Sequence, residues 1–310
     1  MSKNVTMRER NMKQETSRQK VMKIVVQVLL YAFLIAMAII VLFPFYWMIN
    51  SSLKTWDEYQ RSVPTFWPNF IATWGDAAPA KIISWIPTNY VDAFNAAGLG
   101  RLFINTVIVG VISTLLSLVI TVLSAFAFAR LEFKGKNVLF AALLATMMIP
   151  GELFTITNYQ TVNDLGWMHT YTVLIVPFLV SVFYIYLLRQ NFLQIPNELY
   201  LAAKVDGTSD IKYLWRVMIP LSLPTLISIT ILKMMGAWNS YVWPRLVAND
   251  DMHKLITNGL RGANLTIETG ETNYPVQMAA VAIVSAPLFL VFVFLRKYIM
   301  KGVSKSGIKG

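Results

Sequence analysis

Long apolar stretches separated by polar segments dominate the chain. Each is close to or longer than the ~20 residues that an α-helix needs to cross a bilayer, and they run at 24–49, 102–129, 137–157, 171–188, 219–243 and 276–295. The runs are continuous, whereas a transmembrane barrel would show many short segments of alternating polarity. Because a backbone in lipid must satisfy its hydrogen bonds within the segment, the pattern predicts an all-α integral membrane protein with six transmembrane helices.

The composition agrees with this class. Of the 310 residues, 56% are hydrophobic and 14% are charged, which is too apolar for a soluble domain of this size. Residues 1–20 are polar and mixed in charge, and we expect them to be flexible. The other segments are a six-span domain at 21–300, with polar loops at 51–101, 190–218 and 244–275, and a short tail at 301–310.

The longest segment between apolar spans that is neither apolar nor disordered in composition is 198–224. Its pattern predicts two short helices joined by a hinge. Pro196 suits a first helical position, and Glu198 then lies in the first turn, where its charge meets the positive end of the helix dipole. Gly207 can adopt the left-handed conformation that ends a helix. Ser209 can cap the helix that follows.

Both predicted helices have an apolar face. On the first helix, Leu199, Ala202 and Ala203 recur at i, i+3 and i+4, which gives a surface on which another protein could rest closely. The apolar stripe of the second helix consists of Ile211, Leu214, Trp215 and Met218. This stripe must also rest on another surface.

This segment resembles the EAA loop of ABC importer permeases, the cytoplasmic helical hairpin that docks on the ATPase subunit. The residues that carry the resemblance are Glu198, Ala202, Ala203, Asp206, Gly207, Ile219, Pro220 and Pro224. The segment departs from the family pattern at Leu201, where many members have Glu, so Glu198 is either a helix-start residue or the coupling acid. The resemblance implies that the ATPase-coupling residues are Glu198, Ala202, Ala203, Asp206, Gly207 and Ser209. A hairpin that merely links two spans is the alternative.

Other segments resemble the same family, and the likeness extends over nearly the whole chain from about residue 25. It is carried by Asn105 and Thr106, by Ala125, Ala127 and Arg130, by 147–151, by Trp238, Asn239 and Tyr241, and by the Lys-Gly ending. Pro150 and Gly151 would also interrupt the third helix. The ending and the spans are similar to the second permease of maltose-type carbohydrate importers.

Lys233 lies about halfway along the fifth apolar stretch. A central lysine costs about 2.5–3.5 kcal/mol on insertion scales, so it should face a water-filled path, another subunit or a carboxylate. A path with this lysine would permit an acidic oligosaccharide. The alternative is a lysine that reaches the membrane edge or pairs within the assembly.

Trp238 and Asn239 follow on the same stretch, and Gln277 lies in the sixth. An indole beside an amide can stack on and hydrogen-bond a sugar, although the pair would equally stabilise a helix end. Together with Lys233, these residues are the candidates for a translocation path.

The basic residues predict the orientation. If the N-terminus lies inside, 19 of the 27 Lys and Arg are on inner segments, 7 are on outer segments and Lys233 is within a span. The inner residues are 7 in 1–23, 3 in 130–136, 4 in 189–218 and 5 in 296–309. The positive-inside rule therefore places both termini and the hairpin in the cytoplasm, and the loops 51–101 and 244–275 outside. The net charge of +11 is explained by these flanking residues, without a nucleic-acid partner.

The sequence contains no cysteine and only two histidines. It therefore lacks a Cys or His metal cluster and a Cys-His nucleophile pair. It also lacks a GxxxxGK[ST] phosphate loop, so we expect no catalysis, metal or cofactor in this chain. The resemblance implies that a separate ABC ATPase dimer binds ATP and magnesium.

The resemblance further implies a heterodimer with a second permease, a solute-binding protein outside the cell and a carbohydrate substrate, in the multi-pass setting of a bacterial cell membrane. A secondary active transporter of a small polar solute is the main alternative. Such transporters normally have paired broken helices and several intramembrane charges, whereas only Lys233 is clearly central here. A non-transporting scaffold or a membrane enzyme is a further alternative, and it would leave the hairpin motif unexplained.

Overall fold

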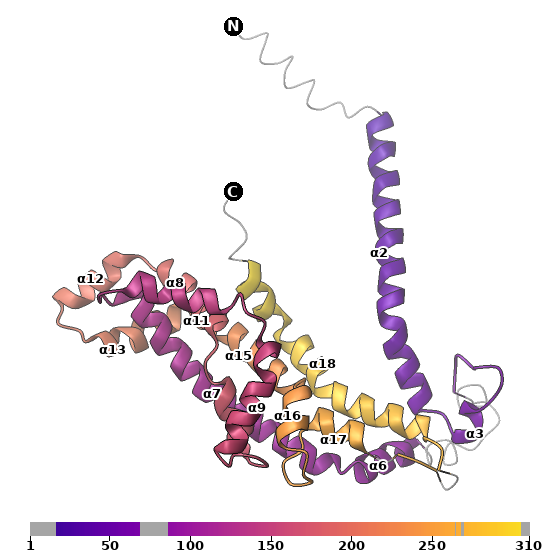
Figure 1. Ribbon diagram of the computed structural model, residues 1–310. Coiled ribbons are helices and arrows are strands. Elements are labelled where there is room, and N and C mark those ends of the chain that lie inside the picture. The colour runs from indigo at the N-terminus through magenta and orange to yellow at the C-terminus, as the bar shows by residue number, and fades with distance from the viewer. Residues whose placement is uncertain (1–16, 69–85, 264, 268–269, 305–310) are drawn as a thin grey trace.

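The computed structural model describes residues 17–68, 86–263, 265–267 and 270–304. Its regular structure is helical (Figure 1), which confirms the all-α prediction. The described part of the chain contains no strand, only an isolated antiparallel bridge between Thr266 and Thr272.

Three helices are long and apolar enough to cross a membrane. They are α2 (Ser17–Ser52), α7 (Leu99–Arg130) and α18 (Tyr274–Ser304). They contain the first, second and sixth predicted spans and extend beyond them at both ends. Thus α2 begins inside the segment 1–20 that we expected to be flexible, and α18 includes the first residues of the predicted tail; residues 1–16 and 305–310 lie outside the described part.

Each of the other three predicted spans is a bent pair of helical segments, and counting each pair as one span gives up to six. The third consists of α8 (Lys136–Thr146), η1 (Gly151–Phe154) and α9 (Thr155–Asp164), with a bend of 83°. The fourth consists of α10 (Tyr171–Ile175), η2 (Val176–Phe178) and α11 (Val182–Leu193), with a bend of 45°. The fifth predicted span begins with α14 (Ile219–Leu221), which continues α13 (Asp210–Tyr213) and η3 (Leu214–Met218) of the preceding loop, and after a bend of 80° it continues as α15 (Leu223–Trp238).

Proline explains where these helices break, because it lacks the N–H that would continue the hydrogen-bond ladder. In the third span the helix breaks at Pro150, the residue before η1, as the sequence predicts. The breaks in the fourth and fifth segments contradict the continuous helices that we expected at 171–188 and 219–243. There Pro177 lies in η2 and Pro224 in the first turn of α15. The fifth helix also ends early, at Trp238.

The polar loops contain short helices. They are α3 (Trp56–Tyr59), α6 (Ile86–Ala96), α12 (Asn197–Val205), α16 (Val242–Val247) and α17 (Ile256–Gly262). In Figure 1, α12 and α13 project at one end of the bundle, whereas α6 and α17 lie at the other end. Helix α7 is central, since it packs against α6, α11, α15 and α17. Helix α2 packs only on α18 among the long helices and otherwise stands apart from the bundle (Figure 1).

Helix α17 lies against α7 at a glycine. An added methyl carbon at Gly259 would lie 2.4 Å from two methyl carbons of Leu102, whose own side chain is buried. We expect Gly259→Ala to cost about 1–3 kcal/mol by overpacking, measured as a lower midpoint of thermal unfolding in detergent. Gly262→Ala is the matched control, because its methyl would meet no described atom within 4 Å. Equal midpoints for the two variants would contradict this close contact.

Candidate functional site

The hairpin at 197–218 has the local structure that its sequence predicts. Helix α12 starts at Asn197, one residue later than expected, with Pro196 as the extended residue before it and Glu198 in the first turn. Gly207 has a φ of +68° and ends the helix. The Ser209 hydroxyl accepts a hydrogen bond from the Lys212 N–H at 3.4 Å and so caps α13. The predicted turn and cap are therefore confirmed.

The two helices of the hairpin divide their apolar residues between an inner and an outer side. Ala203, which we expected on the docking face, packs on an inner cluster that includes Phe192 and Leu214. Leu214 and Met218 are fully buried. Ile211 and Trp215, predicted on the same stripe, are instead 57% and 62% exposed. The buried face is therefore centred on Leu214 and Met218, whereas Ile211 and Trp215, which are also four residues apart, lie at the outer edge of the predicted stripe.

The outer side forms an apolar patch, which we call the hairpin surface. Its residues are Leu199, Leu201, Ala202, Val205, Ile211 and Trp215, all of which are exposed. The other predicted coupling residues beside it, Glu198, Asp206, Gly207 and Ser209, are exposed as well. The described part of the chain thus leaves apolar and acidic side chains of both hairpin helices available to a partner.

An ion pair joins the two helices of the hairpin. Lys204 Nζ lies 2.8 Å from Asp210 Oδ1, and the Tyr200 hydroxyl donates to the same oxygen at 2.8 Å. The hydrogen bond from Lys204 lowers the pKa of Asp210, an effect that partial burial opposes, and the bond to Asp210 in turn raises the pKa of Lys204. Because both groups are well exposed, we expect the pair to orient the helices more than to stabilise them.

Two arginines connect the hairpin to the bundle. Buried Arg130, the last residue of α7, donates through Nη2 to the carbonyl oxygens of Phe192 and Ile195 at 2.9 and 2.5 Å. In the opposite direction, Arg189 of α11 donates through Nε to the carbonyl oxygen of Phe128 at 3.0 Å. The two helices therefore bind each other's terminal carbonyl groups just before the hairpin begins.

The turn at Gly207 allows a direct test of the hairpin geometry. The N–H groups of Gly207 and Thr208 bond back to Lys204 and Ala203 at 3.1 and 2.9 Å, the pattern of a Schellman motif. A left-handed conformation costs about 1–2 kcal/mol for most residues but much less for Asn. We expect Gly207→Ala to speed hydrogen exchange at the Thr208 amide by about tenfold, with Gly207→Asn close to wild type. Identical exchange in the Ala variant and wild type would refute the strained turn.

A second candidate region is a partly open cavity of about 330 Å³ within the bundle. Parts of α7, η2, α11, α15 and α16 surround it. Its aromatic residues are Phe178, Tyr184 and Trp243, and its hydroxyl-bearing residues also include Ser113, Ser181 and Ser240. Lys233 is the one charged side chain among the described residues that line it.

Of the four residues predicted for a translocation path, the structure brings only Lys233 to this cavity. Trp238 donates through Nε1 to the Val284 carbonyl at 3.3 Å, and its ring lies 5.5 Å from that of Phe103, so it packs between α7 and α18. Asn239 is the C-cap of α15 and donates to the Met235 carbonyl at 3.0 Å.

Gln277, the fourth, is half-buried near the start of α18 and is not among the lining residues. Sequence reasoning missed Tyr184, Ser240 and Trp243, which do line the cavity. Tyr184 lies in α11, whereas Ser240 and Trp243 follow the end of α15, beside the Trp238, Asn239 and Tyr241 of the family resemblance.

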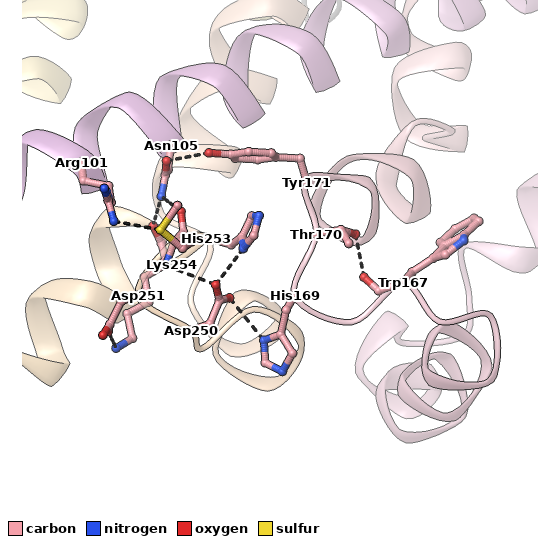
Figure 2. Close-up of polar contacts among 11 residues, drawn as sticks. Arg101, Asn105, Trp167, His169, Thr170, Tyr171, Asp250, Asp251, His253 and Lys254 are labelled. Atoms are coloured by element: carbon pink, nitrogen blue, oxygen red, sulfur yellow. Dashed lines mark hydrogen bonds and ion pairs between the residues drawn. The ribbon is translucent and has the colours of Figure 1, made fainter.

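A polar cluster at the end of the bundle away from the hairpin fixes one cavity wall (Figure 2). Asn105 donates to the carbonyl oxygens of Met252 and Lys254 at 2.8 and 3.0 Å and accepts from the Tyr171 hydroxyl at 2.8 Å. These bonds hold the segment that leads into Leu255, which lines the cavity.

In the same cluster, Asp250 bridges two histidines. Its carboxylate oxygens lie 3.2 Å from His169 Nδ1 and 2.8 Å from His253 Nδ1 (Figure 2). Burial opposes ionisation of Asp250, but its hydrogen bonds, above all the one with His253, outweigh this and lower its pKa. The bridge links the loop after α9 to the loop before α17.

Broken apolar helices around a polar cavity, with an amphipathic hairpin projecting from one end, define a polytopic subunit of a membrane transport system. The family model described as "Binding-protein-dependent transport system inner membrane component" matches residues 117–305. The chain belongs to this family, the permeases of ABC importers.

Individual relatives agree with this assignment. The probable ABC transporter permease protein YurM of Bacillus subtilis is 30% identical over 290 residues, which cover 92% of this chain and 88% of that protein. The arabinooligosaccharides transport system permease protein AraQ of Bacillus subtilis is 28% identical over 287 residues, covering 92% and 97%. In fold, the chain is similar to a chain of a bacterial ABC transporter involved in the import of the acidic polysaccharide alginate, with a TM-score of 0.75, 22% identity and coverage of 92% and 99%.

Proposed function

We propose that this chain is one of two permease subunits of an ATP-driven carbohydrate importer in a bacterial cell membrane. It crosses the membrane six times with both termini in the cytoplasm, forms half of the translocation path with a second permease, and receives substrate from a solute-binding protein outside. A separate ATPase dimer hydrolyses ATP with magnesium. The carbohydrate class is supported by relatives such as the arabinooligosaccharide permease.

The observation that carries the proposal is the hairpin surface. Exposed apolar side chains on an ordered helical hairpin are typical of a protein interface, and on the hairpin they include Leu201, Val205 and Trp215. The positive-inside rule assigns the hairpin to the cytoplasm, where the ATPase would bind. ATP-driven closure of the ATPase dimer would then move the hairpin as a rigid body, since Arg130 donates to Asn197 Oδ1 at 3.4 Å and Ala203 and Leu214 belong to the apolar cluster under the hairpin.

Transport requires that the two ATPase states bind the hairpin with different affinities, because coupling is a difference in free energy between states. The spans attached to the hairpin would then switch the cavity between the two sides of the membrane. The bends in the third, fourth and fifth spans supply the places where such a switch can occur without breaking the packing of α7.

Mass spectrometry of the C-terminally tagged chain, gently purified from its native membranes, tests the assembly. We expect a second permease, an ATPase and a binding protein to co-purify. Since the chain has no cysteine, Ser209→Cys introduces a single thiol for crosslinking at the hairpin. A monodisperse chain that yields no ATPase even after this crosslinking would instead favour a secondary transporter, as would uptake that resists vanadate and stops when the proton gradient is dissipated.

A charge on the hairpin surface should weaken ATPase binding. Val205 is 89% exposed at the end of α12, so Val205→Asp leaves the fold intact. When the ATPase binds, the new carboxylate would lose its water, which costs binding free energy. We expect at least about a tenfold loss of co-purified ATPase, which corresponds to about 1.4 kcal/mol. Val63→Asp is the matched control, since Val63 is 76% exposed outside the hairpin. Unchanged ATPase recovery with Val205→Asp would remove this surface from the interface.

A further inference from the structure

The cavity combines a single cation with mostly apolar and hydroxyl-bearing walls. Lys233 reaches it from α15 and is half-buried. No Asp or Glu is among the described residues that line the cavity, and no ion pair of Lys233 occurs in the described part of the chain. A partly buried ammonium group without a counter-charge is costly, and one that is paired is much less so.

Lys233 already has one defined hydrogen-bond partner. Its Nζ donates to the carbonyl oxygen of Phe178, the last residue of η2, where the helix breaks before α11 and the carbonyl loses its partner in the ladder. An ammonium group has three donors. The bond therefore fixes the position of the charge and leaves two N–H donors for a ligand.

The remaining lining fits a saccharide. The ring of Phe178 lies 5.7 Å from that of Trp243 at 84°, and the indole N–H of Trp243 is used by the Val173 carbonyl at 2.9 Å, so both rings contribute apolar surface. Ser181 and Ser240 add hydroxyl groups. The volume of about 330 Å³ lies at the small end of the ~300–1,000 Å³ typical of ligand cavities, so this cavity would hold part of a longer glycan.

We propose that the cavity binds the anionic group of an acidic carbohydrate, a carboxylate or a phosphate ester, and that Lys233 provides its counter-charge. The proposal rests on the proposed function and specifies its substrate class. Sugar rings would lie on the aromatic walls, while the oxyanion accepts the two free N–H groups of Lys233.

The experiment must separate the charge of Lys233 from its hydrogen bond to Phe178. Lys233→Gln removes the charge but keeps an N–H donor for the carbonyl, Lys233→Arg keeps both, and Lys233→Met removes both. Lys134→Gln makes the same change of charge in the exposed turn before α8 and serves as control. The assembled transporter, purified through the tagged chain and reconstituted in liposomes with its binding protein, would be tested with trigalacturonate, galactotriose and glycerol 3-phosphate.

We expect wild type to take up trigalacturonate or glycerol 3-phosphate at least about ten times faster than galactotriose, and the preferred anion distinguishes carboxylate from phosphate. Lys233→Gln should lose this anion uptake by about tenfold or more, which corresponds to about 1.4 kcal/mol, while the second permease and the ATPase still co-purify with it. Lys233→Arg and Lys134→Gln should retain the uptake.

Four results would overturn the proposal. They are preference of wild type for galactotriose, unchanged anion uptake in Lys233→Gln, loss of the co-purified second permease from Lys233→Gln, which would assign the charge to assembly, and no uptake of any of the three compounds. In the first three cases ATP-driven saccharide uptake by wild type would leave the proposed function standing. The fourth also leaves it standing, because an importer of another sugar would give the same result. ATP-independent uptake would reject the proposed function as well.

Discussion

Carbonyl groups at the ends of interrupted helices set the main constraint on this structure. In a bilayer an unpaired carbonyl costs several kcal/mol, so a broken span is stable only if another group donates to it. Basic side chains meet this need in three places. Lys233 donates to Phe178 at the break in the fourth span, Arg130 donates to the end of α11, and Arg189 donates to the end of α7. Lys233 thereby supports the bend in the fourth span, and the two arginines satisfy carbonyl groups where α7 and α11 end.

The two arginines have a further consequence for the transmission of force. Arg130 and Arg189 lie on different helices and each binds the carbonyl groups of the other helix, so α7 and α11 cannot separate at their C-terminal ends without breaking charge-assisted bonds in both directions. The inner cluster under the hairpin includes Tyr213 and Leu214, both fully buried. A movement imposed on α12 would therefore be passed to α7, the central helix of the bundle. A flexible connection between the two would instead absorb the movement.

Much of this architecture follows from local sequence rules, and the parts that do not share a physical cause. Hydropathy identified every apolar segment, and Gly207 and Ser209 behaved as their residue types predict. Hydropathy cannot detect a bend inside an apolar run, so the breaks in the fourth and fifth spans were missed. The apolar stripe of the second hairpin helix indicated its amphipathic character but not which of its edges is buried, since Leu214 lies inside and Trp215 outside. The cavity is assembled from distant segments, and only a buried charge signalled one of its residues.

That charge is informative because the hydrogen bond alone does not require it. A neutral amide could donate to the Phe178 carbonyl at a much smaller desolvation cost than an ammonium group. Lys233 therefore carries a charge beyond what the break in the helix needs, and the described lining of the cavity contains no carboxylate that offsets it. The described residues at the cavity supply no compensating negative charge, and an open cavity with aromatic walls is a place where a ligand can bring it.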